Sequence, residues 1–126
     1  MSATVVDASA IAAVLFDEPE AAPVMASAGS TLLAPGLLRY EMASICAAKL
    51  QREPKLARMT LQRYRLFNGL AIEFLDPDWG ALPLLARQWE LSAYDAAYLQ
   101  LALKRKVPLL TLDARLAQAY DKAAVL

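Results

Sequence analysis

The stretch LSAYDAAYLQLALKRKVPLLTLD, residues 91–113, predicts a helix followed by a buried strand, with an acidic residue in the helix and another just past the strand. Ser92 is a typical helix N-cap, and Asp95 stands three positions later, as the partner in a capping box does. Asp95 then shares a helical stripe with Tyr98 and Leu99, which should face the core. An acid in a core-facing stripe needs a specific reason, so it indicates a functional site.

The second acid, Asp113, follows a segment typical of a short buried strand, residues 107–112. In an open parallel sheet, ligands bind at the carboxyl ends of the strands, where Asp113 would lie. Each acid also has an ordinary explanation. Asp95 fits a residue that only stabilises the positive end of a helix dipole, and Asp113 fits a simple N-cap for a helix over residues 114–120. The case for chemistry therefore depends on further acids.

The rest of the chain predicts strands that alternate with helices. Further strands are expected at residues 3–6, 31–34 and 71–75, with a last short one at 123–126, and further helices at 7–15, 20–28, 37–51, 55–67 and 78–90. This order predicts one α/β domain over residues 1–126, a three-layer α/β/α sandwich around a mostly parallel five-stranded sheet in the order 3-2-1-4-5. In that order Asp7, after the first strand, faces Asp113 across the topological switch point.

Composition fits a single domain that contains an unusual amount of apolar surface. The 126 residues are 58% hydrophobic, and the mean hydropathy is +0.32, yet no run reaches the roughly 18 apolar residues of a membrane span. The surplus suggests a buried interface with a second copy or a bound peptide. The N-terminal residues lack the basic region of a signal peptide, and the single Cys46 forms no internal disulfide, so we expect a cytoplasmic protein without a membrane partner.

Histidine is absent, and the formal net charge is zero. These two facts exclude a Ser-His-Asp triad, a histidine-ligated zinc site and adhesion to nucleic acid by bulk charge. Catalysis would therefore use carboxylates, hydroxyls or a metal ion. The basic residues gather in two groups after Arg39, where most are expected on solvated faces and a few could contact phosphates.

A third acid in an apolar stripe is Glu41, which shares a face of the predicted helix 37–51 with Leu37 and Ile45. Burying a lone carboxylate is costly unless something neutralises it. The ordinary alternative is that Glu41 lies at the edge of the stripe and pairs with Arg39 or Lys49. Taken alone, Glu41 does not decide between the two.

Together Asp7, Glu41, Asp95 and Asp113 predict an acidic cluster assembled from distant parts of the chain. Like charges packed together repel strongly, so such a cluster usually shares protons or binds a cation. Oxygen ligands alone favour a hard cation, Mg²⁺ or Mn²⁺, over zinc. Magnesium often bridges carboxylates and a substrate phosphate, which points to phosphoryl chemistry.

Four fragments resemble, in order and spacing, the PIN-domain ribonucleases, and among these the VapC toxins of bacterial toxin-antitoxin pairs: VVDASA (5–10), RYEMAS (39–44), LSAYDAAYLQLA (91–102) and LLTLDARL (109–116). The resemblance implies that the four acids are catalytic, with Thr111 and Ser9 as supporting hydroxyls. It also implies that Asp7 and Asp95 are direct metal ligands, with Asp113 completing the site directly or through water.

The same resemblance implies metal-dependent hydrolysis of RNA phosphodiesters, with Glu41 orienting or deprotonating the attacking water. It further implies a homodimer and a small VapB-like antitoxin that lies in a groove beside helices 37–51 and 55–67. The main competing hypothesis is an inactive PIN-like scaffold that only binds RNA or a protein. A phosphotransferase with Asp7 as nucleophile is disfavoured, because Ser9 stands where such enzymes have a second acid.

Overall fold

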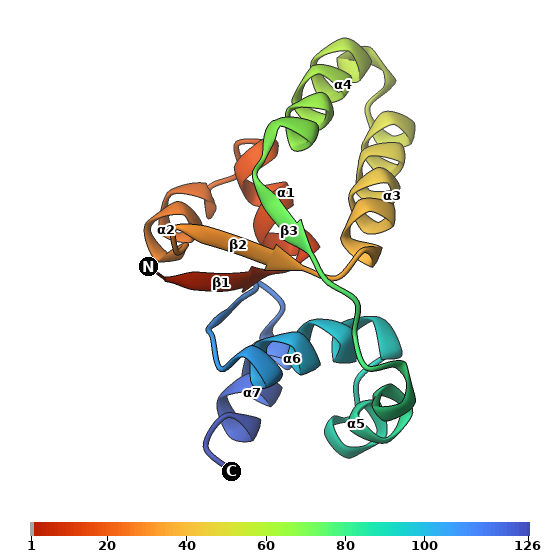
Figure 1. Ribbon diagram of the computed structural model, residues 1–126. Helices are drawn as coiled ribbons and strands as arrows, with labels where there is room; N and C mark the ends of the chain where they lie inside the picture. Colours follow the sequence, from red (N-terminus) through yellow and green to blue (C-terminus); the bar gives the residue numbers. More distant parts are fainter. Residues whose placement is uncertain (1) are drawn as a thin grey trace.

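The protein is described by a computed structural model that covers residues 2–126 and contains a four-stranded parallel sheet between two layers of helices (Figure 1). The strands are β1 (Ala3–Val6), β2 (Thr31–Ala34), β3 (Ile72–Phe74) and β4 (Leu109–Leu110). Their order is β3-β2-β1-β4, and all three pairings are parallel. The predicted α/β fold and the predicted order of the first four strands are confirmed.

The helices that cover the sheet are α1 (Ala8–Leu15), α2 (Ala21–Ser27), α3 (Leu37–Arg52), α4 (Ala57–Arg65), α5 (Leu82–Trp89), α6 (Ala93–Arg105) and α7 (Ala114–Ala123). Three short 3₁₀ turns join them: η1 (Pro54–Leu56), η2 (Leu66–Gly69) and η3 (Trp79–Ala81). In Figure 1, α1, α3 and α4 lie on one side of the sheet, and α5 to α7 lie on the other. No helix within residues 2–126 is long and apolar enough to cross a membrane.

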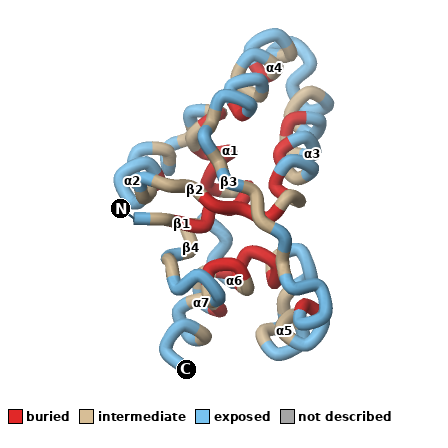
Figure 2. The backbone as a smooth tube through the Cα atoms, viewed as in Figure 1, coloured by how far each residue is buried: buried red, intermediate tan, exposed pale blue. Residues whose placement is uncertain are grey.

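The core forms where β1 and α6 pack together (Figure 2). Val5 of β1 and Leu99 of α6 have no exposed surface, and Tyr98 is 1% exposed. A central parallel strand is covered by helices on both faces, which is why Thr4, Val5 and Val6 of β1 are all buried instead of alternating between buried and exposed. The carboxyl end of β1 is thereby held rigidly, with Asp7 directly after it.

The predicted fifth strand at residues 123–126 is wrong. Helix α7 continues to Ala123, and the chain then ends in a turn with Val125 82% and Leu126 89% exposed. Two features of the chain explain why no strand forms at these residues. The alanine pair Ala123-Ala124 favours continued helix over strand, and β4 is only two residues long, so it offers little backbone for a further strand to pair with.

Two other predicted segments are shorter than expected. The strand predicted over residues 107–112 is reduced to Leu109–Leu110, because Thr111 leaves the ladder to bond Asp7 through its side chain. The helix predicted over residues 78–90 divides into η3 and α5, with Pro83 in the first turn of α5, where a missing N–H costs nothing.

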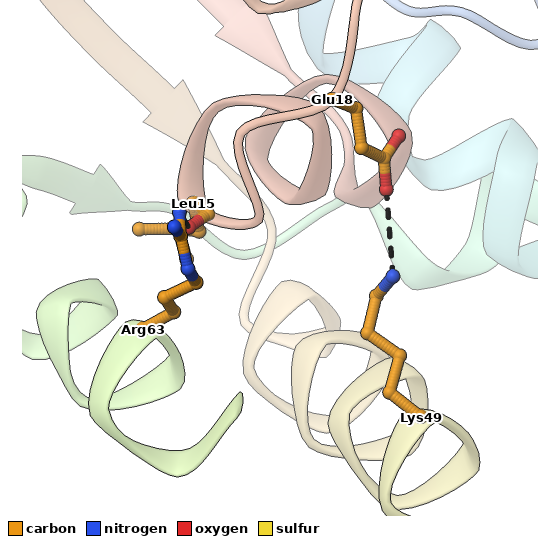
Figure 3. Close-up of polar contacts among 4 residues, drawn as sticks. All are labelled: Leu15, Glu18, Lys49 and Arg63. Atoms are coloured by element: carbon orange, nitrogen blue, oxygen red, sulfur yellow. Dashed lines mark hydrogen bonds and ion pairs between the residues drawn. The ribbon is translucent and has the colours of Figure 1, made fainter. Parts of the chain in front are cut away.

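The helical hairpin of α3 and α4 stands away from the sheet and is fastened to the end of α1 (Figure 3). Lys49 of α3 lies 3.6 Å from a carboxylate oxygen of Glu18, and Arg63 of α4 donates a hydrogen bond of 3.4 Å to the carbonyl oxygen of Leu15. A cation near the last carbonyls of a helix is favourable, because these carry the negative end of the helix dipole. The contacts orient α3, whose first turns carry Glu41.

The loop before β2 approaches β1 so closely that only glycine fits at position 29. An added Cβ on Gly29 would stand 2.7 Å from the Thr4 hydroxyl oxygen and 2.9 Å from the backbone oxygen of Ser2. The Gly29 amide also donates a hydrogen bond of 2.9 Å to that hydroxyl. We expect Gly29→Ala to lower the free energy of unfolding by about 1–3 kcal/mol, as overpacking does, measured by urea denaturation.

The matched control for this prediction is Gly69→Ala, since a Cβ at Gly69 would meet nothing within 4 Å. Gly69→Ala should leave stability unchanged or raise it slightly. Equal stabilities of the two variants would contradict the close approach at Gly29.

Candidate active site

The predicted site residues gather at the carboxyl edge of the sheet, where β1 and β4 lie side by side. Asp7 follows β1 and caps α1, while Thr111 follows β4 and leads to Asp113, which caps α7. The edge lies at the point where the chain order reverses, with β2 on one side of β1 and β4 on the other. Such a switch point leaves a crevice between diverging loops, in which ligands bind.

Asp7 is buried and held by a set of hydroxyl donors from both strand ends. Its Oδ1 accepts hydrogen bonds from the Ser9 hydroxyl at 2.7 Å and from the Ala10 amide at 3.1 Å, and its Oδ2 accepts one from the Thr111 hydroxyl. The Ser9 oxygen in turn accepts the Leu112 amide hydrogen at 2.9 Å. Ser9 and Thr111 thus join the ends of β1 and β4 and fix the orientation of the Asp7 carboxylate.

Glu41 reaches the same edge from the beginning of α3 and meets the Tyr98 hydroxyl of α6. Tyr98 donates a hydrogen bond of 2.6 Å to Glu41 Oε1. The ordinary alternative for Glu41 is not realised, because Lys49 pairs with Glu18 and the Arg39 guanidinium lies 3.7 Å from the centre of the Phe74 ring. Glu41 therefore keeps a second oxygen, Oε2, outside its bond to Tyr98.

Asp95 lies in the first turn of α6, at the predicted helix start. Ser92 is the N-cap, and its hydroxyl accepts the Asp95 amide hydrogen at 3.1 Å. The reciprocal half of a capping box is missing: within residues 2–126, no donor makes a hydrogen bond to the Asp95 carboxylate. Capping therefore does not occupy this side chain, and it remains available to a ligand.

Asp113 is exposed and does serve as an N-cap. Its Oδ1 accepts hydrogen bonds from the amides of Arg115 at 2.9 Å and Leu116 at 3.2 Å. The ordinary explanation, that Asp113 is an N-cap, is therefore correct. Its charge nevertheless acts on the site, because it raises the pKa of both Asp95 and Asp7.

The acids influence one another electrostatically, as expected for a cluster. Burial is the main cause that raises the pKa of Asp7, Glu41 and Asp95. Neighbouring carboxylates add to it: Asp95 and Asp7 raise the pKa of Glu41, while the hydrogen bond from Tyr98 lowers it. Burial and the Glu41 carboxylate raise the pKa of Tyr98, so its hydroxyl stays protonated and donates. The four acids therefore form one coupled group.

The acids of the site fit a divalent cation only in part. Within residues 2–126, no three acidic or cysteine side chains stand where they could hold one metal ion, so the predicted ligands Asp7, Asp95 and Asp113 do not converge on a single point. The reason is that oxygens of Asp7 and Asp113 already accept hydrogen bonds from the protein, and carboxylates of like charge repel one another. The donors are nevertheless all oxygen atoms, and Mg²⁺ commonly takes one or two carboxylates with water and substrate phosphate. The residues fit a hard cation through a subset of the acids.

Two residues beside the acids were missed as site residues from the sequence. The sequence predicts Tyr98 as a core residue, but a buried tyrosine hydroxyl needs a hydrogen-bond partner, and that need is the signal that points to Glu41. Arg115 lowers the pKa of Asp95, and its guanidinium donates a hydrogen bond of 2.7 Å to the carbonyl oxygen of Glu90. No feature of the sequence distinguished Arg115 from the other basic residues.

Comparison with known proteins agrees with this architecture. The model of the PIN domain family matches residues 4–122. The crystal structure of PAE2754 from Pyrobaculum aerophilum superposes with a TM-score of 0.75 at 18% sequence identity, over 98% of this chain and 93% of that one. Among curated proteins, none matches the sequence. The similarity in structure extends over nearly the whole chain and shows the fold.

The repulsion among the acids should be visible as a pH-dependent stability. Because burial and the charges of Asp113 and Asp7 raise the Asp95 pKa in the folded protein, folding favours protonated Asp95. That stabilisation is complete below the pKa of the unfolded chain and is lost as the pH rises through the folded pKa. Without divalent ions, Asp95→Asn should raise Tm by about 2–4 °C near pH 7 and by nothing below about pH 4, measured by thermal unfolding across pH.

The control for this prediction is Asp121→Asn, which removes an exposed carboxylate from α7 outside the site. It should not reproduce the pH-dependent gain. If Asp95→Asn is no more stable than the unmodified protein near neutral pH, the acids do not repel one another as described.

Proposed function

Because this chain belongs to the PIN-domain family, whose fold is generally that of a metal-dependent nuclease, we propose that it is an Mg²⁺- or Mn²⁺-dependent endoribonuclease and the toxin of a VapBC-type toxin-antitoxin pair. The observation that carries the nuclease proposal is the coupling of four acids at the switch-point edge, where burial and mutual charge raise the pKa of Asp7, Glu41 and Asp95. A hard cation relieves that repulsion and links the acids to a substrate phosphate.

In this proposal Asp7 is the best-positioned cation ligand. Its carboxylate is held by Ser9 and Thr111 from two adjacent strand ends, so little side-chain entropy remains to be lost on binding. Ser9 and Thr111 are positioning residues, because they act through Asp7 and through the backbone of residues 112 and 113.

Asp95 and Asp113 are the other acids proposed to bind the cation, through its water molecules where they do not reach it directly, since the three carboxylates do not converge on one point. Asp95 has no hydrogen-bond donor within residues 2–126, so a cation there displaces no protein contact. Oδ1 of Asp113 accepts hydrogen bonds from the first turn of α7, which leaves Oδ2 for a cation or one of its waters. When bound, Mg²⁺ or Mn²⁺ supplies Lewis-acid polarisation of the phosphodiester and a lowered pKa of water.

Glu41 is the proposed group that orients the attacking water and accepts its proton. Tyr98 fixes one carboxylate oxygen, Oε1, and leaves Oε2 for a water molecule. Burial and the neighbouring acids raise the Glu41 pKa, which makes the carboxylate a stronger base than an exposed glutamate. Tyr98 is therefore a positioning residue for this step.

A basic pocket beside the acids supports a nucleic-acid substrate. It measures about 320 Å³ and is lined by two cations, Arg115 and Lys122, by one acid, Glu90, and by the amide side chains of Gln88 and Gln118. Arg115 also lies close enough to Asp95 to lower its pKa. The guanidinium and ammonium groups of this pocket suit the phosphates that flank the one being cleaved.

The α3–α4 hairpin supports the proposed antitoxin partner. Leu56 and Met59 are 41% and 44% exposed and line a groove of about 230 Å³, whose charged lining residues are Lys49, Arg63, Asp17 and Glu53. Exposed apolar side chains beside charges of both signs suit an amphipathic segment that carries charged residues. The homodimer expected from the sequence stays a prediction.

The test of the nuclease is metal-dependent cleavage of RNA by purified protein, followed on single-stranded and hairpin substrates. Glu41→Gln and Asp7→Asn should each reduce the rate at least about 100-fold, and removal of divalent ions with EDTA should abolish it. Neither variant should unfold, because each neutral amide removes repulsion. The matched control is Glu73→Gln, an exposed acid of β3, which should cleave normally.

Cleavage by Glu41→Gln at the unmodified rate would refute the proposed role of Glu41. Absence of metal-dependent cleavage by the unmodified protein would instead favour the inactive scaffold.

The toxin proposal has its own test. Expression of the unmodified chain in bacteria should arrest growth, and Asp7→Asn should not, since arrest depends on cleavage. Co-expression of the small protein encoded next to the gene should restore growth, and Leu56→Asp should weaken their co-purification by placing an acid in the apolar part of the groove. Growth arrest by Asp7→Asn equal to that of the unmodified chain would contradict an enzymatic toxin.

A further inference from the structure

Two exposed tyrosines flank the acidic site. We propose that Tyr40 and Tyr94 form a stacking site for one unpaired base of the substrate RNA, on the nucleotide next to the phosphate that is cleaved. The inference rests on the proposed nuclease function and adds to it a base-recognition site that the acids alone do not provide.

Both tyrosines directly precede an acid of the site. Tyr40 comes before Glu41 in the first turn of α3, and Tyr94 comes before Asp95 in the first turn of α6. Successive helix residues point about 100° apart, so when the acid turns towards the sheet edge its neighbour points outward beside it. Tyr40 is 82% and Tyr94 is 67% exposed, whereas Tyr98 of the same α6 is buried.

The two tyrosines meet at one pocket of about 440 Å³, whose remaining lining residues are Leu37, Glu41 and Ser44. This volume is within the range of about 300–1,000 Å³ usual for small-molecule sites. The pocket is lined by two aromatic rings, one aliphatic chain, two groups able to hydrogen-bond a base edge, and no cation. A phosphate is therefore disfavoured there, and a flat neutral base is favoured.

Glu41 belongs both to this pocket and to the proposed catalytic residues. The same side chain lines the pocket and accepts the hydrogen bond from Tyr98. A ligand in the pocket is thus in contact with the proposed proton acceptor. The phosphates have a separate place, since the basic pocket with Arg115 and Lys122 adjoins the acids at Asp95.

Base stacking is the interaction that exposed tyrosine rings offer to RNA, and it determines which form of RNA can bind. Aromatic side chains stack on any base, and each such contact contributes measurably to binding single strands. A base inside a duplex is already stacked and paired, so it cannot enter the pocket. The site therefore favours single-stranded or loop RNA, and a hydrogen bond between the Ser44 hydroxyl and the base edge supplies a preference among bases.

The experiment measures RNA binding and cleavage separately for Tyr40→Ala and Tyr94→Ala. Each variant should raise both the Kd for a fluorescent single-stranded oligonucleotide and the KM for cleavage roughly 5- to 100-fold, with kcat changed much less. Tyr40→Phe and Tyr94→Phe keep the ring and should stay within about twofold of the unmodified protein. Trp79→Ala, which removes a 69% exposed aromatic ring outside this pocket, is the control.

A second readout identifies the base itself. A single abasic nucleotide, moved stepwise along the oligonucleotide, should weaken binding to the unmodified protein at one position next to the cleaved phosphate. The same abasic position should weaken RNA binding by Tyr40→Ala and Tyr94→Ala only a little further, because the tyrosine that stacks on the base is already missing in these variants.

The proposal is overturned if both alanine variants bind and cleave RNA as the unmodified protein does, or if no abasic position weakens binding. It is also overturned if these variants lose only the binding of a protein partner. Absence of metal-dependent cleavage by the unmodified protein would refute the proposed nuclease but not the base-stacking site. The oligonucleotide-binding measurement would still decide whether the tyrosines hold a base.

Discussion

The repulsion among partly buried carboxylates at one edge of the sheet is the constraint on which the rest of the structure depends. Asp7, Glu41 and Asp95 each have a raised pKa, first through burial and then through one another and Asp113. A fold tolerates such a group only if other interactions hold it in place. Here the central strand β1, buried on both faces, supplies that support.

The surroundings hold the acids without neutralising them. Hydroxyls of Ser9, Thr111 and Tyr98 bond the carboxylates, and a hydroxyl orients a carboxylate without cancelling its charge. Lys49 is engaged with Glu18 and Arg39 with the Phe74 ring, and Arg115 lowers the pKa of Asp95 without reversing its rise. The negative charge is thereby left to an external cation, which is the arrangement expected of a metal-dependent nuclease and unusual for a structural ion-pair network.

The three surfaces around the acids differ in chemistry, and each suits a different part of the proposed function. The pocket with Arg115 and Lys122 offers charge, the pocket with Tyr40 and Tyr94 offers aromatic faces, and the α3–α4 groove offers apolar side chains beside charges of both signs. Placing phosphate, base and protein partner on separate surfaces keeps a partner at the groove from competing directly with the acids for the cation.

The sequence by itself determined the α/β class, the positions of most elements and the four acids, because strand and helix periodicities and N-cap residues such as Ser92 and Asp113 are local signals. It did not exclude a fifth strand at residues 123–126, since whether a short segment pairs depends on the length of its neighbour β4. Only the tertiary structure joined Tyr98 to Glu41, exposed Leu56 and Met59, and brought Tyr40 and Tyr94 to one pocket. These contacts join residues up to 57 positions apart, and no local pattern encodes which distant helices will meet.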